Sequence, residues 1–176
     1  ELRAVVQQYD PLIGQAGARP ALYSVWPMAS RQFDFLRAIE SYTLAAADVN
    51  GVLLPVAQAW LEAWSIDPAL PLYAGDGLHP SELGSYLAGL VISAVLLERS
   101  PEGLPSSLRL HSGALITIPP QVAAALQLAA RRAVERAAGA RGESNGASGA
   151  RASARGKSNG ASGARGGGRG AAVRGR

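Results

Sequence analysis

The sequence predicts an α/β fold with a parallel sheet, because two short apolar runs alternate with segments of helical periodicity. The runs are "ALYSVW" at 21–26, enclosed by prolines, and "GVLLPV" at 51–56. Their length and apolar content are typical of buried strands. Between them, Phe35, Ile39 and Tyr42 recur at helical spacing before an Asn-Gly pair ends the segment. Strands that alternate with helices are typical of βα units, in which the strands lie parallel.

Four further helices are expected from their end signals. They cover residues 2–9, 57–64, 81–97 and 117–139. Asp10-Pro11 closes the first of them, Ser81 is the expected N-cap of the third, and Gly139 is the expected C-cap of the last. Parallel strands are normally covered on both faces and paired at both edges. Two strands against this number of helices indicate an incomplete sheet, so we expect residues 1–138 to be the C-terminal part of a larger α/β domain.

The charge is concentrated in the C-terminal segment. Residues 139–176 contain eight basic residues and one acid, a net charge of +7, which leaves −3 for residues 1–138. The segment is rich in Gly, Ala, Ser and Arg, repeats "SNGASGAR" at 144–151 and 158–165, and offers no apolar face. We therefore predict a disordered, low-complexity tail. Its arginines suit RNA or another polyanion, but it lacks aromatic residues for base stacking, which favours a solubilising extension.

Two absences narrow the class of protein further. The chain has no cysteine, which excludes disulfide scaffolds, cysteine nucleophiles and cysteine metal sites. No apolar run is long enough to span a bilayer; the nearest, 83–97, is too short. No metal or organic cofactor is predicted.

One loop carries the residues best suited to chemistry, "YAGDGLHPSELGSYLAGL" at 73–90. An imidazole titrates near neutral pH and can take the proton of a serine hydroxyl, provided that an acceptor fixes its other nitrogen. Asp76 lies three residues before His79 across a glycine-containing turn and can reach that nitrogen. His79 is therefore the candidate general base and acid, and Asp76 its orienting partner. The alternative is an ordinary turn at the start of a helix that happens to contain a histidine.

The wider stretch "DGLHPSELGSYLAG" resembles the last sequence block of the SGNH (GDSL-type) esterase and lipase family. Asp76, His79, Pro80, Gly84 and Tyr86 fall where that pattern expects them. "ALYSVWP" looks like a strand of the same family, and "RSPEGLP" with the helix after it resembles the C-terminal extension of many bacterial members. The resemblance covers residues 1–138 and none of the tail.

The resemblance implies a three-layer α/β/α, flavodoxin-like sheet that is incomplete at the N-terminus here. It also implies a serine ester hydrolase of the carboxylesterase or acetylesterase type, acting on a small-molecule ester. The family's Gly-Asp-Ser-like nucleophile block and its oxyanion-hole glycine and asparagine are missing. Five serines are considered as the nucleophile, and all of them lack that context: Ser24, Ser30, Ser41, Ser65 and Ser81. We expect the chain to hold the His–Asp half of the site and to be inactive alone. Family members are often exported, and any signal peptide would lie upstream of Glu1.

Two other functions stay open at the level of sequence. One is a non-catalytic module that binds esters or carbohydrates, and the other is binding of RNA or another polyanion through the basic tail. His111, in "LRLHSG", has no partner nearby and is predicted to be structural or exposed. Trp26, Trp60 and Trp64 are predicted to lie in the core or in pocket walls.

Overall fold

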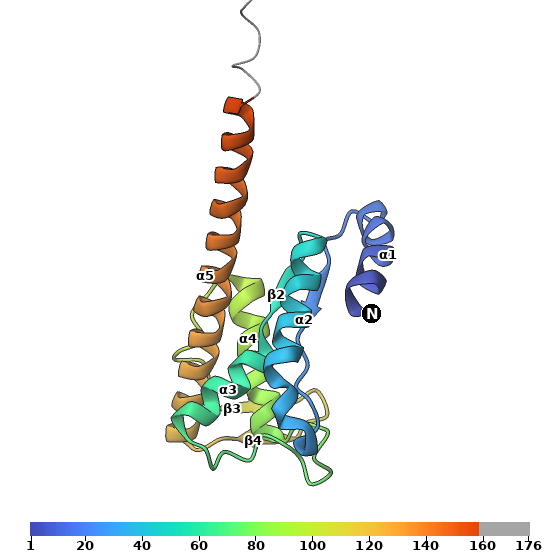
Figure 1. Cartoon of the computed structure of the whole chain (residues 1–176). Coiled ribbons are helices and arrows are strands. Elements are labelled where there is room, and N and C mark those ends of the chain that lie inside the picture. Colours follow the sequence, from blue (N-terminus) through green and yellow to red (C-terminus); the bar gives the residue numbers. More distant parts are fainter. Residues whose placement is uncertain (159–176) are drawn as a thin grey trace, which may run out of the picture. The chain divides into compact units, whose positions relative to one another are not determined.

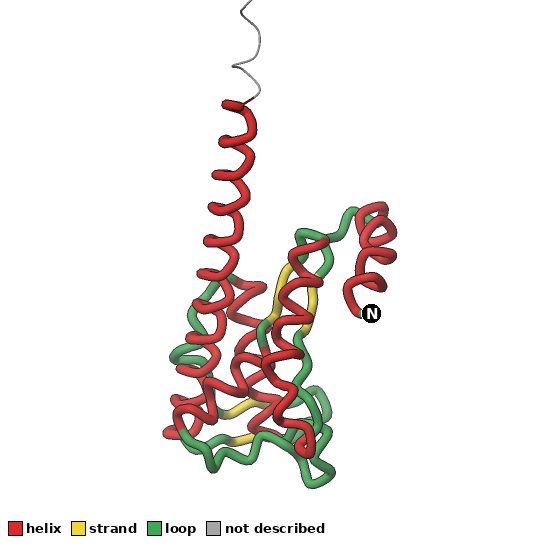
Figure 2. Tube along the Cα trace, viewed as in Figure 1, coloured by secondary structure: helices red, strands yellow, loops and turns green. Residues whose placement is uncertain are grey.

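The computed structural model describes the backbone of residues 1–158 and the side chains of residues 1–140. The chain divides between Ala138 and Gly139 into two units, and the first carries the fold and the site described below. The elements of the described chain are shown in Figures 1 and 2. They follow the order α1 (Leu2–Gln15), β1 (Ala21–Tyr23), η1 (Ala29–Asp34), α2 (Phe35–Asp48), β2 (Val52–Leu54), α3 (Val56–Ile66), α4 (Glu82–Leu97), β3 (Ser107–Arg109), β4 (Leu115–Thr117) and α5 (Pro120–Ser158).

Strands β1 and β2 form a small parallel sheet. Ala21 lies opposite Val52 and Tyr23 opposite Leu54. The Val52 N–H donates to the Pro20 carbonyl over 2.8 Å, which extends the pairing to the residue before β1. Both predicted strands and their parallel direction are confirmed, although each strand is shorter than the apolar run that predicted it.

Helix α2 packs against both strands, and α1 packs against α2 (Figure 1). Apolar side chains of β1, β2 and the C-terminal end of α2 form a small core: Leu22, Ala45, Ala46, Val49 and Leu53. Leu2 and Val6 of α1 are partly buried against it. Arg3 of α1 forms a bidentate ion pair with Asp48 of α2, with Nε 2.6 Å from Oδ2 and Nη2 2.7 Å from Oδ1.

The predicted end of α1 at Asp10-Pro11 is wrong, because the helix continues to Gln15. Proline removes one backbone donor and leaves the carbonyl four residues earlier without its helical partner. No residue of α1 is buried. Water can therefore hydrate the freed carbonyl of Gln7, and the helix tolerates Pro11.

The larger core joins α3, α4 and α5, and an aromatic cluster forms part of it. Trp60 is fully buried and stacks on Trp26, with ring centroids 4.1 Å apart and planes 9° apart. Trp64 and Tyr73 meet its ring edge-on, at 5.6 and 4.8 Å. Trp26 and Trp60 are buried core residues and Trp64 packs against them, as expected.

Two further elements differ from the prediction. Strands β3 and β4 form an antiparallel hairpin that the sequence did not reveal. Helix α5 runs past its expected end at Gly139 to Ser158. The backbone of 139–158 is therefore helical where a disordered tail was predicted, and the rest of the predicted tail, 159–176, lies outside the described residues. No proline follows Pro120 in this segment, and a glycine weakens a helix without forbidding it.

Within the part of the chain that the structure describes, no helix is long and apolar enough to cross a bilayer.

Candidate functional site

The loop that carries the candidate pair connects α3 to α4 and closes on itself. Tyr73 bridges to Pro80 across the loop, and the Ser81 N–H donates to the Leu72 carbonyl over 2.8 Å. Inside, the Ala74 N–H donates to the His79 carbonyl, also over 2.8 Å. The loop ends therefore meet at the core, and the loop tip projects from a fixed base.

Helix α4 starts at this base with a cap and a close contact. Ser81 accepts a hydrogen bond from the Gly84 N–H over 3.2 Å, which confirms the predicted N-cap. A Cβ at Gly84 would lie 2.4 Å from the Leu72 carbonyl oxygen and 3.0 Å from Trp60. Only glycine lets the first turn of α4 approach the loop and the aromatic core this closely.

Asp76 and His79 meet as the sequence predicted. The Nδ1–H of His79 donates to Oδ2 of Asp76 over 2.6 Å. The other carboxylate oxygen, Oδ1, accepts from the backbone N–H groups of Leu78 and His79, each over 3.0 Å. One carboxylate therefore shapes the turn and orients the imidazole ring that the turn presents.

The electrostatics of the pair define which nitrogen carries the proton. The hydrogen bond from His79, and then those from the two backbone N–H groups, lower the pKa of Asp76 from 3.8 to about 2. An ionised carboxylate can only accept, so Nδ1 of His79 carries a proton, and in the neutral imidazole Nε2 is left as an acceptor. The His79 side chain is 72% exposed, so a reacting group can approach Nε2.

The segment that leaves the carboxyl end of β1 is fastened to this loop at three points. The indole N–H of Trp26 donates to the Leu78 carbonyl over 3.0 Å. The Ala29 N–H donates to the Gly77 carbonyl over 2.8 Å, and the hydroxyl of Tyr73 to the Pro27 carbonyl over 2.5 Å. The pair thus lies at the carboxyl end of a parallel strand, where α/β folds place their sites.

Gly77 is required by both conformation and space. Its φ of +67° lies in the left-handed region, and a Cβ there would come within 3.2 Å of the Ala29 Cβ. The tight turn between Asp76 and His79 depends on this glycine.

Three of the serines considered in the sequence hold backbone instead of facing His79. Ser24, buried beyond β1, donates to the Leu54 carbonyl over 3.1 Å and accepts from the Ala57 N–H over 3.2 Å. The Ser65 hydroxyl donates to the Glu62 carbonyl, and Ser81 caps α4. Among the described side chains, no hydrogen bond joins a serine to His79. His111 is exposed, as predicted, at the tip of the β3–β4 hairpin.

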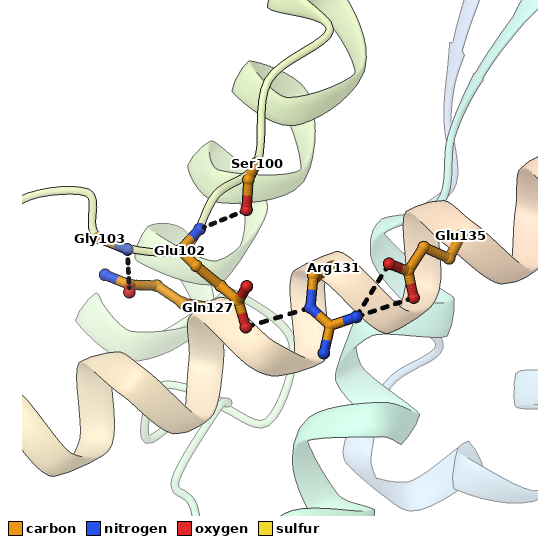
Figure 3. Close-up of polar contacts among 6 residues, drawn as sticks. All are labelled: Ser100, Glu102, Gly103, Gln127, Arg131 and Glu135. Atoms are coloured by element: carbon orange, nitrogen blue, oxygen red, sulfur yellow. Dashed lines mark hydrogen bonds and ion pairs between the residues drawn. The ribbon is translucent and has the colours of Figure 1, made fainter.

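A second group of polar contacts was not foreseen, and Figure 3 shows those that Gln127 and Arg131 of α5 make with Glu102, Gly103 and Glu135. Gln127 is buried; its amide oxygen accepts from the Gly103 N–H over 2.9 Å, and its amide nitrogen donates to the Tyr86 hydroxyl over 3.0 Å. Arg131 forms ion pairs with Glu102 and Glu135. The pair of Arg131 with Glu135 lies within α5. The contacts with Tyr86, Glu102 and Gly103 fasten α4 and the connection after it to α5, so this group is structural. A lone glutamine on the apolar face of a helix, in "AALQLAA", was the signal for them.

This group also fixes the role of Tyr86. Tyr86 matches the family pattern, yet its hydroxyl donates to the Pro105 carbonyl over 3.1 Å and does not contact the pair. In the described residues, no group of three or more His, Asp or Glu side chains is placed to bind a metal ion.

No family model and no curated protein matches the sequence. Among solved structures, the fold is similar to the crystal structure of a DUF4886 family protein from Bacteroides uniformis, with a TM-score of 0.59 and 18% sequence identity. The match covers 76% of this chain and 58% of that protein, so this chain spans little more than half of its length. At this identity the likeness shows a shared fold.

Proposed function

We propose that residues 1–138 supply the acid–base half of a serine ester hydrolase site, with His79 as general base and acid and Asp76 as the orienting carboxylate. The observation that carries the proposal is the 2.6 Å hydrogen bond from Nδ1 of His79 to an ionised Asp76. This bond selects the tautomer whose exposed Nε2 can accept a proton from a hydroxyl.

The chemistry of the proposed site is acyl transfer. Nε2 of His79 takes the proton of a serine hydroxyl as the oxygen attacks the ester carbonyl carbon. The imidazolium then returns this proton to the leaving alkoxide, and the acyl group stays on the serine. Water then loses a proton to His79 as its oxygen attacks the acyl carbon. The bond from that carbon to the serine oxygen breaks, the imidazolium returns the proton to the serine, and the acid is released. The steps move protons and an acyl group only, and they require no redox cofactor.

The serine would come from the missing Gly-Asp-Ser-like block that the family resemblance implies, and the oxyanion-hole glycine and asparagine from the missing blocks that follow it. In that arrangement β1 and β2 are two strands of a larger parallel sheet within a three-layer α/β/α domain. The parallel pairing of the strands supports this proposal. So does the similarity to a structure of which this chain covers 58%.

The proposal is tested by labelling a longer protein, one that includes the residues upstream of Glu1, with a fluorophosphonate probe for activated serines. We expect one labelled serine upstream of Glu1 and turnover of p-nitrophenyl acetate. His79→Ala should slow both reactions, and the 176-residue chain alone should show neither.

Equal labelling and equal turnover in the His79→Ala protein would contradict the proposal. A longer protein that is neither labelled nor active would favour the alternative of a module that binds esters or carbohydrates without cleaving them.

A further inference from the structure

The peptide bond between Leu78 and His79 is held on both sides by side chains from different parts of the chain. Its N–H donates to Oδ1 of Asp76 over 3.0 Å. Its carbonyl oxygen accepts from the indole N–H of Trp26 over 3.0 Å. A peptide group is planar, so these two hydrogen bonds together fix the plane from which the His79 side chain projects.

Trp26 is itself immobilised by the aromatic core. It is only 8% exposed and stacks face to face on the fully buried Trp60. Tyr23 meets the Trp26 ring edge-on at 6.3 Å. A close-packed ring of this kind has one orientation, so the direction of its N–H is set by the core.

We propose that Trp26 is a positioning residue for the Asp76–His79 pair: its indole N–H holds the Leu78–His79 peptide so that both partners of the pair face each other. Trp26 acts through the loop and does not touch the reacting atoms. The catalytic consequence rests on the function proposed above, whereas the geometric consequence does not.

The proposal has a direct physical readout in the pair itself. If the Leu78 carbonyl is released, the turn that aims two backbone N–H groups and the imidazole at Asp76 loosens. Since those three hydrogen bonds depress the pKa of Asp76, loosening them should raise it. It should also reduce the population of imidazole that carries its proton on Nδ1.

Trp64 offers a matched control in the same cluster. Its indole N–H donates to the Leu70 carbonyl over 3.0 Å, the same kind of bond at the same length as that of Trp26. Its ring also meets Trp60. Trp64→Phe therefore removes an equivalent bond, but the Leu70 carbonyl that it releases lies outside the turn from Asp76 to His79.

The experiment compares Trp26→Phe with Trp64→Phe in the 176-residue chain by NMR. Carbon resonances of Asp76 report its pKa, and nitrogen resonances of the His79 ring report the tautomer. We expect Trp26→Phe to raise the pKa of Asp76 from about 2 toward 3.8 and to mix the tautomers. Trp64→Phe should lower the melting temperature comparably and change neither reading.

A further variant covers the case in which Trp26→Phe does not fold. Trp26→benzothienylalanine keeps the shape of the ring and replaces the N–H by sulfur, so that only the hydrogen bond is lost. Unchanged Asp76 and His79 readings in this variant would overturn the proposal, as would equal changes in Trp26→Phe and Trp64→Phe.

In the longer protein, loss of this bond should lower kcat roughly 5- to 10-fold with KM nearly unchanged, the size expected for one hydrogen bond. A longer protein without esterase activity whose Asp76 and His79 readings still shift would overturn the proposed function and leave the positioning role of Trp26 standing.

Discussion

The chain has two histidines, and both lie on exposed loops beside a glycine with left-handed backbone. Gly77, with φ of +67°, precedes His79, and Gly113, with φ of +86°, follows His111. In the hairpin, the Leu110 N–H donates to the Ala114 carbonyl over 2.8 Å. Neither a hydrogen bond nor an ion pair joins the imidazole of His111 to any described residue.

The loop of 73–80 differs in what it adds to its backbone. Asp76 binds the turn and the ring together, and Trp26 brings a fixed donor from the core. A glycine turn therefore places a histidine at the surface in both loops, but only a carboxylate and a core anchor give the ring a defined tautomer and direction. The difference between the two loops is chemical and does not lie in the turn itself.

The largest expected effect is on ester turnover, when each of the two histidines is replaced separately by alanine in the longer protein. His79→Ala removes the proposed base, so ester turnover should fall by about 10²–10⁴-fold. His111→Ala should leave turnover unchanged, since its imidazole has no partner in the described structure. Steady-state hydrolysis of p-nitrophenyl acetate measures both. A loss in His111→Ala as large as in His79→Ala would erase the distinction between the loops.

The next prediction concerns the free energy of unfolding and compares two glycines of α4, of which only Gly84 lies at the base of the 73–80 loop. Gly84→Ala should lower the free energy of unfolding by about 1–3 kcal/mol, because the new Cβ would clash with the Leu72 carbonyl that closes the loop. Gly89→Ala meets nothing within 4 Å. It should stabilise α4 by about 0.5–1 kcal/mol. Urea unfolding followed by circular dichroism tests the opposite signs, and two effects of the same sign would contradict the close approach.

The elements that the sequence predicted well are those whose local signals agree with their packing. The runs at 21–26 and 51–56 are apolar because both strands face cores, and the cap at Ser81 has its partner three residues away. The β3–β4 hairpin was missed because several of its leucines are exposed, so burial gave no pattern: Leu108, Leu110 and Leu115. The ends of α1 and α5 were misplaced because proline and glycine weaken a helix without always ending it.

The pair itself was predictable because its geometry is local, three residues across a glycine turn. The anchor at Trp26 was not, since it lies 52 residues from Leu78 in sequence. Its aromatic character predicted burial, but no local pattern shows where an indole N–H points. The partners of Gln127 were hidden for the same reason, because they come from α4 and from the connection after it.

A smaller effect is expected on the way in which thermal stability depends on pH in the acid range. The pKa of Asp76 is lower in the folded chain, about 2, than its ordinary 3.8. Folding therefore favours the ionised form, and the stability this contributes is present above about 3.8 and is lost as the pH falls through about 2. Asp76→Asn keeps a side-chain oxygen for the turn but has no charge. Its melting temperature should lie below that of the native chain at pH 6, and the gap should close between pH 4 and 2.

The same substitution in a His79→Ala background supplies the control. The hydrogen bond from His79 is the largest cause of the depressed pKa, so the cost of Asp76→Asn at pH 6 should shrink when the imidazole is absent. Thermal unfolding across the pH range measures each case. A gap that widens toward low pH would show that the carboxylate is not ionised in the folded chain.

Removal of residues 139–176 should have the smallest effect, both on the free energy of unfolding and on the two histidine loops. The described side chains that α5 buries all come before this segment: Ala123, Leu126, Gln127, Ala129, Ala130 and Ala133, with Ala137 the last that packs against a core. The polar contacts that fasten the helix, through Gln127, Arg131 and Arg136, also precede the division at Ala138.

A chain ending at Ala138 should thus unfold within about 0.5 kcal/mol of the full chain, and its His79 ring resonances should be unchanged. A melting temperature lower by several degrees, or a shift in the His79 signals, would show that the deleted segment packs on residues 1–138. A shift in the His79 signals would also show that the 73–80 loop depends on residues other than Trp26, its anchor in the core.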